Sequence, residues 1–253
     1  MRRMRVTILG CGTSGGVPRI GNVWGVCDPA EPRNRRRRAS ILVEHDGTRI
    51  LVDTSPDLRE QCLSANVDDL DAVLYTHDHA DHTHGIDDLR GFFFRRQRRM
   101  PIYGDTKTLR TLRTRFPYIF KSVKGYPALV EPTEIDGQFN VNGITVQPFS
   151  QHHGPINSLG FRFGPIAYST DLNGLPEESF KVLKGIDTWV VDALRPEPHP
   201  THAHLDLTLS WIKRVKPRHA VLTHMTWDMD YQTLCRELPD GVLPAYDGMV
   251  IDL

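Results

Sequence analysis

The sequence predicts an α+β protein in which two β-sheets are covered by helices. Three observations support this fold class. At about 150 residues per domain, a chain of 253 residues forms one large domain or two small ones. Predicted strands and helices interleave along the chain without the strict strand–helix–strand alternation of a parallel sheet. No Gly/Ser linker, repeat or low-complexity run divides the chain, so we predict a single domain over residues 1–253.

The individual elements follow from apolar periodicity and from turn residues. Asp46-Gly47 between two apolar runs predicts a β-hairpin. The glycine-rich segment Gly10–Gly16 follows the first strand but lacks the Lys-Ser/Thr of a phosphate-binding loop. Residues 19–39 are predicted to form an irregular loop. The predicted strands are 4–9, 40–44, 49–52, 72–75, 102–103, 133–135, 139–141, 144–149, 159–163, 166–169, 188–191, 220–222 and two short ones after 238; the predicted helices are 56–67, 86–99, 107–116, 177–183, 207–213 and 231–238.

Composition limits the classes of function. The 31 basic residues balance 31 acidic residues, which argues against a surface built for long nucleic acid or for an anionic membrane. The four cysteines show no CxxC spacing and are expected to be reduced, as in the cytoplasm. The basic N-terminus, with Arg2 and Arg3, is followed by an apolar run too short for a signal peptide. No stretch approaches the roughly 18 apolar residues of a membrane span.

The segment Thr76–His82 carries the pattern His-x-His-x-Asp-His directly after an apolar strand. Side chains in such a tight loop can diverge towards one point at the end of a sheet. His77 and His79 are suited to one metal ion, and Asp81 and His82 to a second. Imidazole and carboxylate ligands together favour Zn²⁺ or Mn²⁺ over Ca²⁺. We therefore predict two divalent ions.

This pattern resembles the signature of the metallo-β-lactamase superfamily. The resemblance implies an αββα four-layer sandwich of two mixed sheets and a dinuclear metal site. It further implies that His153 and His224 are ligands, that Asp171 bridges the two ions, and that the carboxylate of Asp53 orients a ligand from outside the metal shell.

Some assignments keep alternatives. His152 competes with the neighbouring His153 for the ligand position. Asp171 could instead be a turn residue or a helix cap. His84 lies outside the motif and is expected to be a neighbour in the pocket or on the surface.

The resemblance narrows to the PhnP-type phosphodiesterases, which open five-membered cyclic phosphates. It rests on four segments, which are 10–18, 34–40, 171–177 and 246–249. It implies that His204 donates a proton to the leaving oxygen, with His202 as the alternative, and that Asp81 belongs to the catalytic group. Ser14, Arg35, Arg36 and His202 are the candidates for substrate binding.

One departure concerns a structural zinc that PhnP-type relatives hold with three cysteines and a histidine. Here Cys27 is the only one of these four ligands, and Trp227 stands at the histidine position. We therefore expect no structural zinc, and we expect Trp24 and Trp227 to fill that space.

The resemblance to the PhnP-type phosphodiesterases therefore implies a metal-dependent hydrolase of cyclic phosphodiesters, either phosphoribosyl cyclic phosphate or 2′,3′-cyclic nucleotides. The expected partners are a small phosphodiester and a second copy in a homodimer. The alternatives are an RNA-processing endonuclease of the tRNA 3′-end type, a non-catalytic nucleotide-binding metal module, and glyoxalase- or lactonase-type hydrolysis. The arginine-rich run 33–38 is compatible with a solvated loop, phosphate recognition or nucleic-acid binding.

Overall fold

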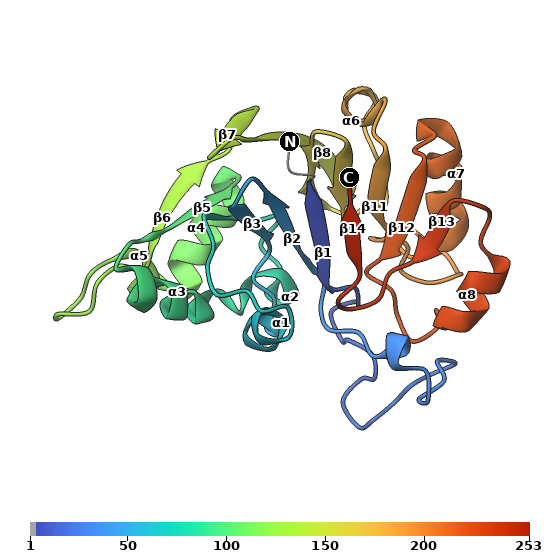
Figure 1. Ribbon diagram of the computed structural model, residues 1–253, viewed down its shortest axis with the longest axis horizontal. Helices are drawn as coiled ribbons and strands as arrows, with labels where there is room; N and C mark the ends of the chain where they lie inside the picture. Colours follow the sequence, from blue (N-terminus) through green and yellow to red (C-terminus); the bar gives the residue numbers. More distant parts are fainter. Residues whose placement is uncertain (1–3) are drawn as a thin grey trace. The chain divides into compact units, whose positions relative to one another are not determined.

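The protein contains two seven-stranded sheets, and the computed structural model describes residues 4–253 (Figure 1). Arg2 and Arg3 lie outside the described residues. The first sheet has the strand order β14-β1-β2-β3-β4-β5-β6, and the second has the order β13-β12-β11-β10-β9-β8-β7. The strands are β1 (Arg5–Gly10), β2 (Ser40–His45), β3 (Thr48–Val52), β4 (Ala72–Leu74), β5 (Met100–Gly104), β6 (Val130–Glu134), β7 (Phe139–Val141), β8 (Ile144–His153), β9 (Ile156–Phe163), β10 (Ile166–Ser169), β11 (Thr188–Asp192), β12 (His219–Thr223), β13 (Val242–Pro244) and β14 (Val250–Asp252).

Both sheets are mixed. In the first, β3 to β6 are parallel, whereas β1 pairs with β14 and β2 with β3 in antiparallel register. In the second, β10 to β13 are parallel, and β8, β9 and β10 pair antiparallel. The carboxyl ends of parallel neighbours lie at one edge of a sheet, which is where ligands commonly bind in such folds.

The helices differ from the predicted ones mainly at their ends. The first predicted helix is shorter because Asn66, at φ 53°, takes the left-handed conformation and ends it. The metal-ligand loop itself contains a short helix that the sequence pattern does not predict. The helices are α1 (Leu58–Ser64), α2 (Ala80–Thr83), α3 (Leu89–Arg96), α4 (Thr106–Arg115), α5 (Pro117–Phe120), α6 (Glu177–Leu183), α7 (Leu205–Val215) and α8 (Tyr231–Glu237), with 3₁₀ turns at Pro32–Asn34 and Ile86–Asp88.

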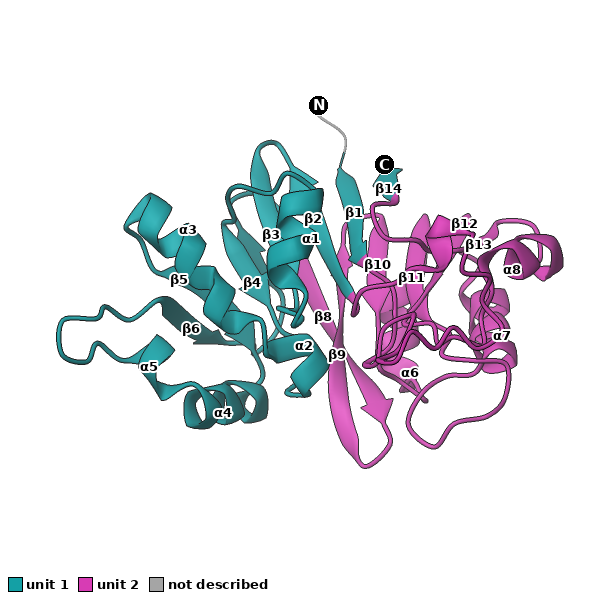
Figure 2. Cartoon of the chain, turned by 90° about the horizontal axis from the view of Figure 1, so that it is seen from below, with its two compact units in different colours: residues 1–9, 40–145, 250–253 teal, residues 10–39, 146–249 magenta. Residues whose placement is uncertain are grey.

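The chain folds into two compact units (Figure 2). Unit 1 comprises Ser40–Thr145 together with Met1–Leu9 and Val250–Leu253, and it carries the first sheet with α1 to α5. Unit 2 comprises Gly10–Ala39 and Val146–Met249, and it carries most of the second sheet with α6 to α8.

The core of unit 1 forms where its helices pack on the first sheet. Leu51 and Val73 from the strands and Leu58, Leu89 and Leu112 from the helices are fully buried in one cluster. Burial of each such side chain contributes roughly 1.5–3 kcal/mol. This packing fixes the helices that lie beside the predicted metal-ligand loop.

Among residues 4–253 there is no helix whose length and apolar character would allow it to cross a membrane.

Candidate metal centre

In unit 1, the predicted metal-ligand loop begins where β4 ends. His77 is buried (1% exposed) and His82 is fully buried, whereas His79 faces solvent. The ring centroid of His77 lies 4.5 Å from that of His79 and 4.5 Å from that of His82. Helix α2 starts directly after His79 and places Asp81 and His82 on its first turn. The four predicted ligands of unit 1 are thus gathered by a strand end and one helical turn.

Asp53 orients this loop from the neighbouring strand β3. Its Oδ2 lies 2.7 Å from His82 Nδ1, and its two oxygens accept hydrogen bonds from the backbone N–H and the hydroxyl of Thr76, each at 2.8 Å. Burial raises the pKa of Asp53, and the contacts with His82 and Thr76 oppose that rise. With Nδ1 of His82 held by a carboxylate, Nε2 is the nitrogen presented for a metal.

Helix α4 anchors the same loop through Asp78. The Asp78 carboxylate accepts a hydrogen bond from Thr111 Oγ1 at 2.9 Å and lies 3.9 Å from Lys107 Nζ. The Asp78 carbonyl accepts a hydrogen bond from the guanidinium of Arg115 at 2.5 Å. Because Asp78 stands between His77 and His79, α4 fixes the backbone from which both side chains project.

In unit 2, the predicted ligands follow the ends of strands of the second sheet. His153 ends β8, Asp171 follows β10, and His224 follows β12. All three are almost fully buried. The Nε2 atoms of His153 and His224 lie 3.7 Å and 3.4 Å from the Asp171 carboxylate. The Asp171 carboxylate therefore lies within 4 Å of both of these predicted histidine ligands.

Asp53, Asp171 and His224 adopt the left-handed backbone conformation, which residues other than glycine rarely take. The φ angles are 64° at Asp53, 55° at Asp171 and 57° at His224, and each residue stands at or just after the end of a strand. Left-handed non-glycine residues cost of order 1 kcal/mol each and cluster at functional sites. Their coincidence here supports a function for this edge in each unit.

The second sheet distinguishes His153 from His152. Side chains alternate across a strand, so neighbouring residues of β8 point to opposite faces. His152 is exposed, and its Nδ1 lies 3.3 Å from Asn157 Oδ1. His153 is buried, and its Nδ1 lies 2.7 Å from the carbonyl of Thr201. Of the two, only His153 points towards Asp171.

His202 lies in the same cluster of unit 2. Its Nδ1 is 3.0 Å from Asp192 Oδ2, its Nε2 is 3.8 Å from Asp171 Oδ1, and its ring stacks on that of His224 at 4.8 Å. His204 instead occupies the N-cap position of α7. Of the two histidines, His202 is the one that contacts predicted ligands, namely Asp171 and His224.

Sequence reasoning missed Asp192. It ends β11, is fully buried, and forms with His202 and His224 a group whose ligand atoms lie within 4.8 Å of one another. The available signal was an apolar strand that ends in a carboxylate, Thr188–Asp192.

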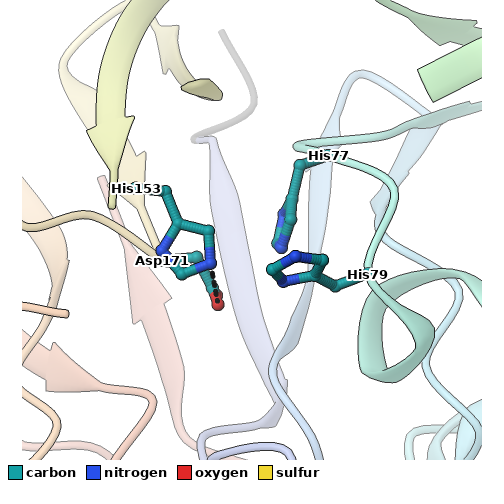
Figure 3. A group of neighbouring side chains, drawn as sticks. All are labelled: His77, His79, His153 and Asp171. Carbon is teal, nitrogen blue, oxygen red and sulfur yellow. Dashed lines mark ion pairs between the residues drawn. The ribbon is translucent and has the colours of Figure 1, made fainter. Parts of the chain in front are cut away.

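The donor set fits divalent metal ions. Figure 3 shows four of the predicted ligands, His77 and His79 of unit 1 and His153 and Asp171 of unit 2, with the His153–Asp171 ion pair dashed. The Nδ1 atoms of His77, His82 and His153 each lie within 3.0 Å of an oxygen. This leaves Nε2 as the coordinating atom in each ring, which is the arrangement of metal-binding histidines in proteins.

A buried guanidinium lies beside Cys27, the one remaining cysteine of the structural zinc set. Arg36 is 2% exposed, and its guanidinium donates to the carbonyls of Thr226 (3.0 Å) and Met229 (2.6 Å) and contacts Cys27 Sγ at 3.8 Å. Arg36 is thus engaged by the protein itself, so we revise its predicted role from substrate binding to structure.

Trp24, in the loop before β2, and Trp227, after β12, each lie against an arginine. Trp227 lies under the guanidinium of Arg19 at 3.4 Å from the ring centroid, and Arg35 lies over Trp24 at 5.1 Å. At Gly25 (φ 59°), an added Cβ would stand 2.7 Å from the Trp227 ring, so only glycine fits. Ser14 and Arg35 are exposed.

Comparison with known proteins agrees with this arrangement. Residues 48–225 match the β-lactamase superfamily domain. A crystal structure of a diphosphatase from the PhnP family superposes with a TM-score of 0.93 at 39% identity, covering 99% of this chain and 97% of that one.

Two curated relatives also match. An octanoyltransferase of Porphyromonas gingivalis is 35% identical over an alignment of 253 positions, which covers 97% of this chain and 51% of that protein. A ribonuclease Z of Bradyrhizobium sp. is 29% identical over 139 residues, 52% of this chain and 46% of that protein. The chain spans about half the length of these two curated relatives. On the domain match and the likeness to the PhnP diphosphatase, the chain belongs to the metallo-β-lactamase superfamily of metal-dependent hydrolases, with the α+β fold of that superfamily and in its PhnP family.

Proposed function

We propose that the protein is a phosphodiesterase that hydrolyses cyclic phosphodiesters, either phosphoribosyl cyclic phosphate or 2′,3′-cyclic nucleotides, with two divalent ions. On the resemblance to the metallo-β-lactamase superfamily, one ion would be held by His77, His79 and His153 and the other by Asp81, His82 and His224, with Asp171 shared between them. Bound Zn²⁺ or Mn²⁺ supplies an activated water and neutralises charge on the phosphoryl oxygens. The proposal is supported by the likeness to a diphosphatase of the PhnP family and by the donor set of each unit.

The observation that carries the proposal is the pair His202–Asp192. When a cyclic phosphate opens, the leaving ribose oxygen needs a proton, and a positioned acid contributes 10²–10⁴-fold to such a step. The Asp192 carboxylate, 3.0 Å from Nδ1, fixes the ring of His202 so that Nε2 can carry the proton. His204, the residue indicated by the sequence resemblance, is the alternative donor and is tested beside it.

The test is a panel of substrates given to the metal-replete protein. It comprises 2′,3′-cyclic nucleotides, 3′,5′-cyclic nucleotides, a nucleoside diphosphate ester and a precursor tRNA. We expect turnover of the 2′,3′-cyclic nucleotides and none of the 3′,5′ isomers, because the five-membered ring is strained. Activity confined to the diphosphate ester or to the tRNA would overturn the proposal.

A second candidate is an RNA-processing endonuclease, favoured by the match to ribonuclease Z. The tRNA arm of the panel tests it directly. The octanoyltransferase match spans 51% of that protein and does not by itself favour acyl transfer here.

We also propose that the protein is a homodimer that acts in the cytoplasm on a small substrate. Light scattering on the purified protein would test the dimer through its mass.

A further inference from the structure

Helix α4, helix α5 and the turn that follows them form an uninterrupted basic segment. Residues 106–126 contain six cations and no acidic residue, although the whole chain is electrically balanced. All six cations are exposed. They are Lys107, Arg110, Arg113, Arg115, Lys121 and Lys124. The zero net charge therefore conceals a local surface of one sign.

The charge of this segment is mostly uncompensated. Lys107 faces the Asp78 carboxylate at 3.9 Å, and no ion pair within residues 4–253 involves Arg110, Arg113, Lys121 or Lys124. The contrast is the neighbouring helix α3. Its Arg95 pairs with Asp68 at 2.9 Å, and its Arg96 pairs with Asp69. The cations of α3 are therefore neutralised within the protein, whereas most cations of the segment 106–126 are available to bind a negatively charged partner.

Aromatic residues are interspersed with these cations along the sequence, and the guanidinium of Arg113 lies 5.7 Å from the centroid of the Phe120 ring. Tyr118 is 47% exposed and Tyr126 is 69% exposed. Tyr126 closes a tight turn with Val123, with Lys124 (φ 48°) and Gly125 (φ 85°) at its tip. Cations beside exposed aromatic rings are the combination with which proteins hold single-stranded nucleic acid, because the cations neutralise phosphates and the rings stack on bases.

The segment is also attached to the predicted metal-ligand loop within unit 1. Arg115 donates to the carbonyl of Asp78, and the ring of Phe116 lies 5.5 Å from that of His84. A strand bound along α4 would therefore lead to the loop that carries His77 and His79.

We propose that residues 106–126 form a binding surface for single-stranded RNA. The choice of RNA over DNA rests on the proposed function, because only RNA ends in a 2′,3′-cyclic phosphate; the charge and the aromatic rings stand independently of that function. The zero net charge argues against binding of long nucleic acid. It does not argue against binding of a short strand to a local basic surface.

The test is the fluorescence anisotropy of a labelled RNA strand of about 12 nucleotides, within the usual site sizes of such surfaces. It uses the full chain, with chelator present so that no turnover occurs. We expect affinity to fall with salt, with a log–log slope of about −0.7 for each phosphate neutralised. The double variant Arg110→Glu/Lys124→Glu should bind at least about tenfold more weakly. The control Lys213→Glu/Arg218→Glu, which makes the same change of charge on unit 2, should bind within about twofold of the unmodified protein.

A second pair of variants separates stacking from charge. Tyr126→Ala should lose about fivefold or more in affinity, and Tyr126→Phe should retain it, because the ring rather than the hydroxyl stacks on a base. Melting temperatures check that the variants are folded. Equal weakening by the two double variants, binding to anionic phosphatidylserine vesicles but not to RNA, or tighter binding of DNA of the same sequence would each overturn the proposal.

This experiment separates the two proposals. Turnover of cyclic mononucleotides without RNA binding would support the proposed function and contradict the proposed RNA-binding surface. RNA binding by a protein that hydrolyses no cyclic phosphate would contradict the proposed substrate and support the RNA-binding surface.

Discussion

At the scale of single residues, the side chains of unit 2 distinguish two histidines that stand two positions apart. His202 contacts Asp192 and Asp171, whereas His204 precedes the first turn of α7. We predict that His202→Ala lowers kcat for a cyclic nucleotide by about 10²–10⁴-fold, the range of a general acid. His204→Ala should have little effect. Turnover is measured at equal metal content, determined by mass spectrometry of the metals; a larger loss in His204→Ala would return the acid role to that residue.

A second prediction at this scale concerns Asp53, which holds Nδ1 of His82 at 2.7 Å. Asp53→Asn keeps the size of the side chain and removes the charge that orients the imidazole. We expect metal affinity to fall about 10–100-fold, the usual cost of losing such a partner. Competition with a chromophoric chelator measures it. The exposed Asp136→Asn in the same unit is the control, and an unchanged affinity in Asp53→Asn would contradict the orienting role.

At the scale of elements, the strands of the site were predictable and the short helix α2 was not. Apolar runs that end in a carboxylate or histidine, such as Ile50–Asp53 and Ala220–His224, mark strands with a functional end. Helix α2 spans four residues, too few to show helical periodicity. The alternation of β8 then decides between His152 and His153, which sequence alone could not do because the register of a strand depends on its partners.

The loop before β2 leads to a third prediction. Arg36 is buried and donates to two carbonyls of the segment 226–229. Arg36→Met removes these bonds and leaves buried acceptors, so we expect the free energy of unfolding to fall by about 3 kcal/mol. Arg35→Met, at an exposed position, should change it by less than about 0.5 kcal/mol. Urea unfolding of the metal-free protein measures both. Equal effects would mean that the buried contacts of Arg36 do not hold this loop.

At the scale of the whole molecule, stability should depend on pH through Asp247. Its carboxylate accepts hydrogen bonds from the N–H of Arg37 (2.8 Å) and of Cys11 (3.1 Å), and burial raises its pKa to about 6. The folded state therefore binds this proton more tightly than the unfolded state does. The stabilisation that protonated Asp247 gives the folded state is fully present below about pH 4 and is lost as pH rises through 6. It amounts to at most about 3 kcal/mol.

Comparison with Asp247→Asn isolates this effect. We subtract the unfolding free energy of the variant from that of the unmodified protein. This difference should decrease as the pH rises from 4 to 6. Urea unfolding at several pH values measures it. A difference that is constant, or that grows with pH, would contradict the raised pKa.

The sequence predicted more of the chemistry of the molecule than of its surfaces. The motif Thr76–His82 is local, so one segment suffices to identify it. The pairing of His202 with Asp192 depends on where β11 and the loop before α7 come together, ten residues apart in the chain. The net charge is zero because acidic residues elsewhere balance the basic segment 106–126. Which of its cations lack an acidic partner depends on the folded structure.

Whether the protein is a two-metal phosphodiesterase is tested by titrating the metal-free protein with Zn²⁺ or Mn²⁺ while hydrolysis of a 2′,3′-cyclic nucleotide is followed. If the ligands of both units act as one dinuclear centre with Asp171 shared, the rate should rise until two equivalents per chain are bound and then stay constant. Full activity at one equivalent, or no hydrolysis at any metal content, would contradict the two-metal phosphodiesterase proposed for this protein.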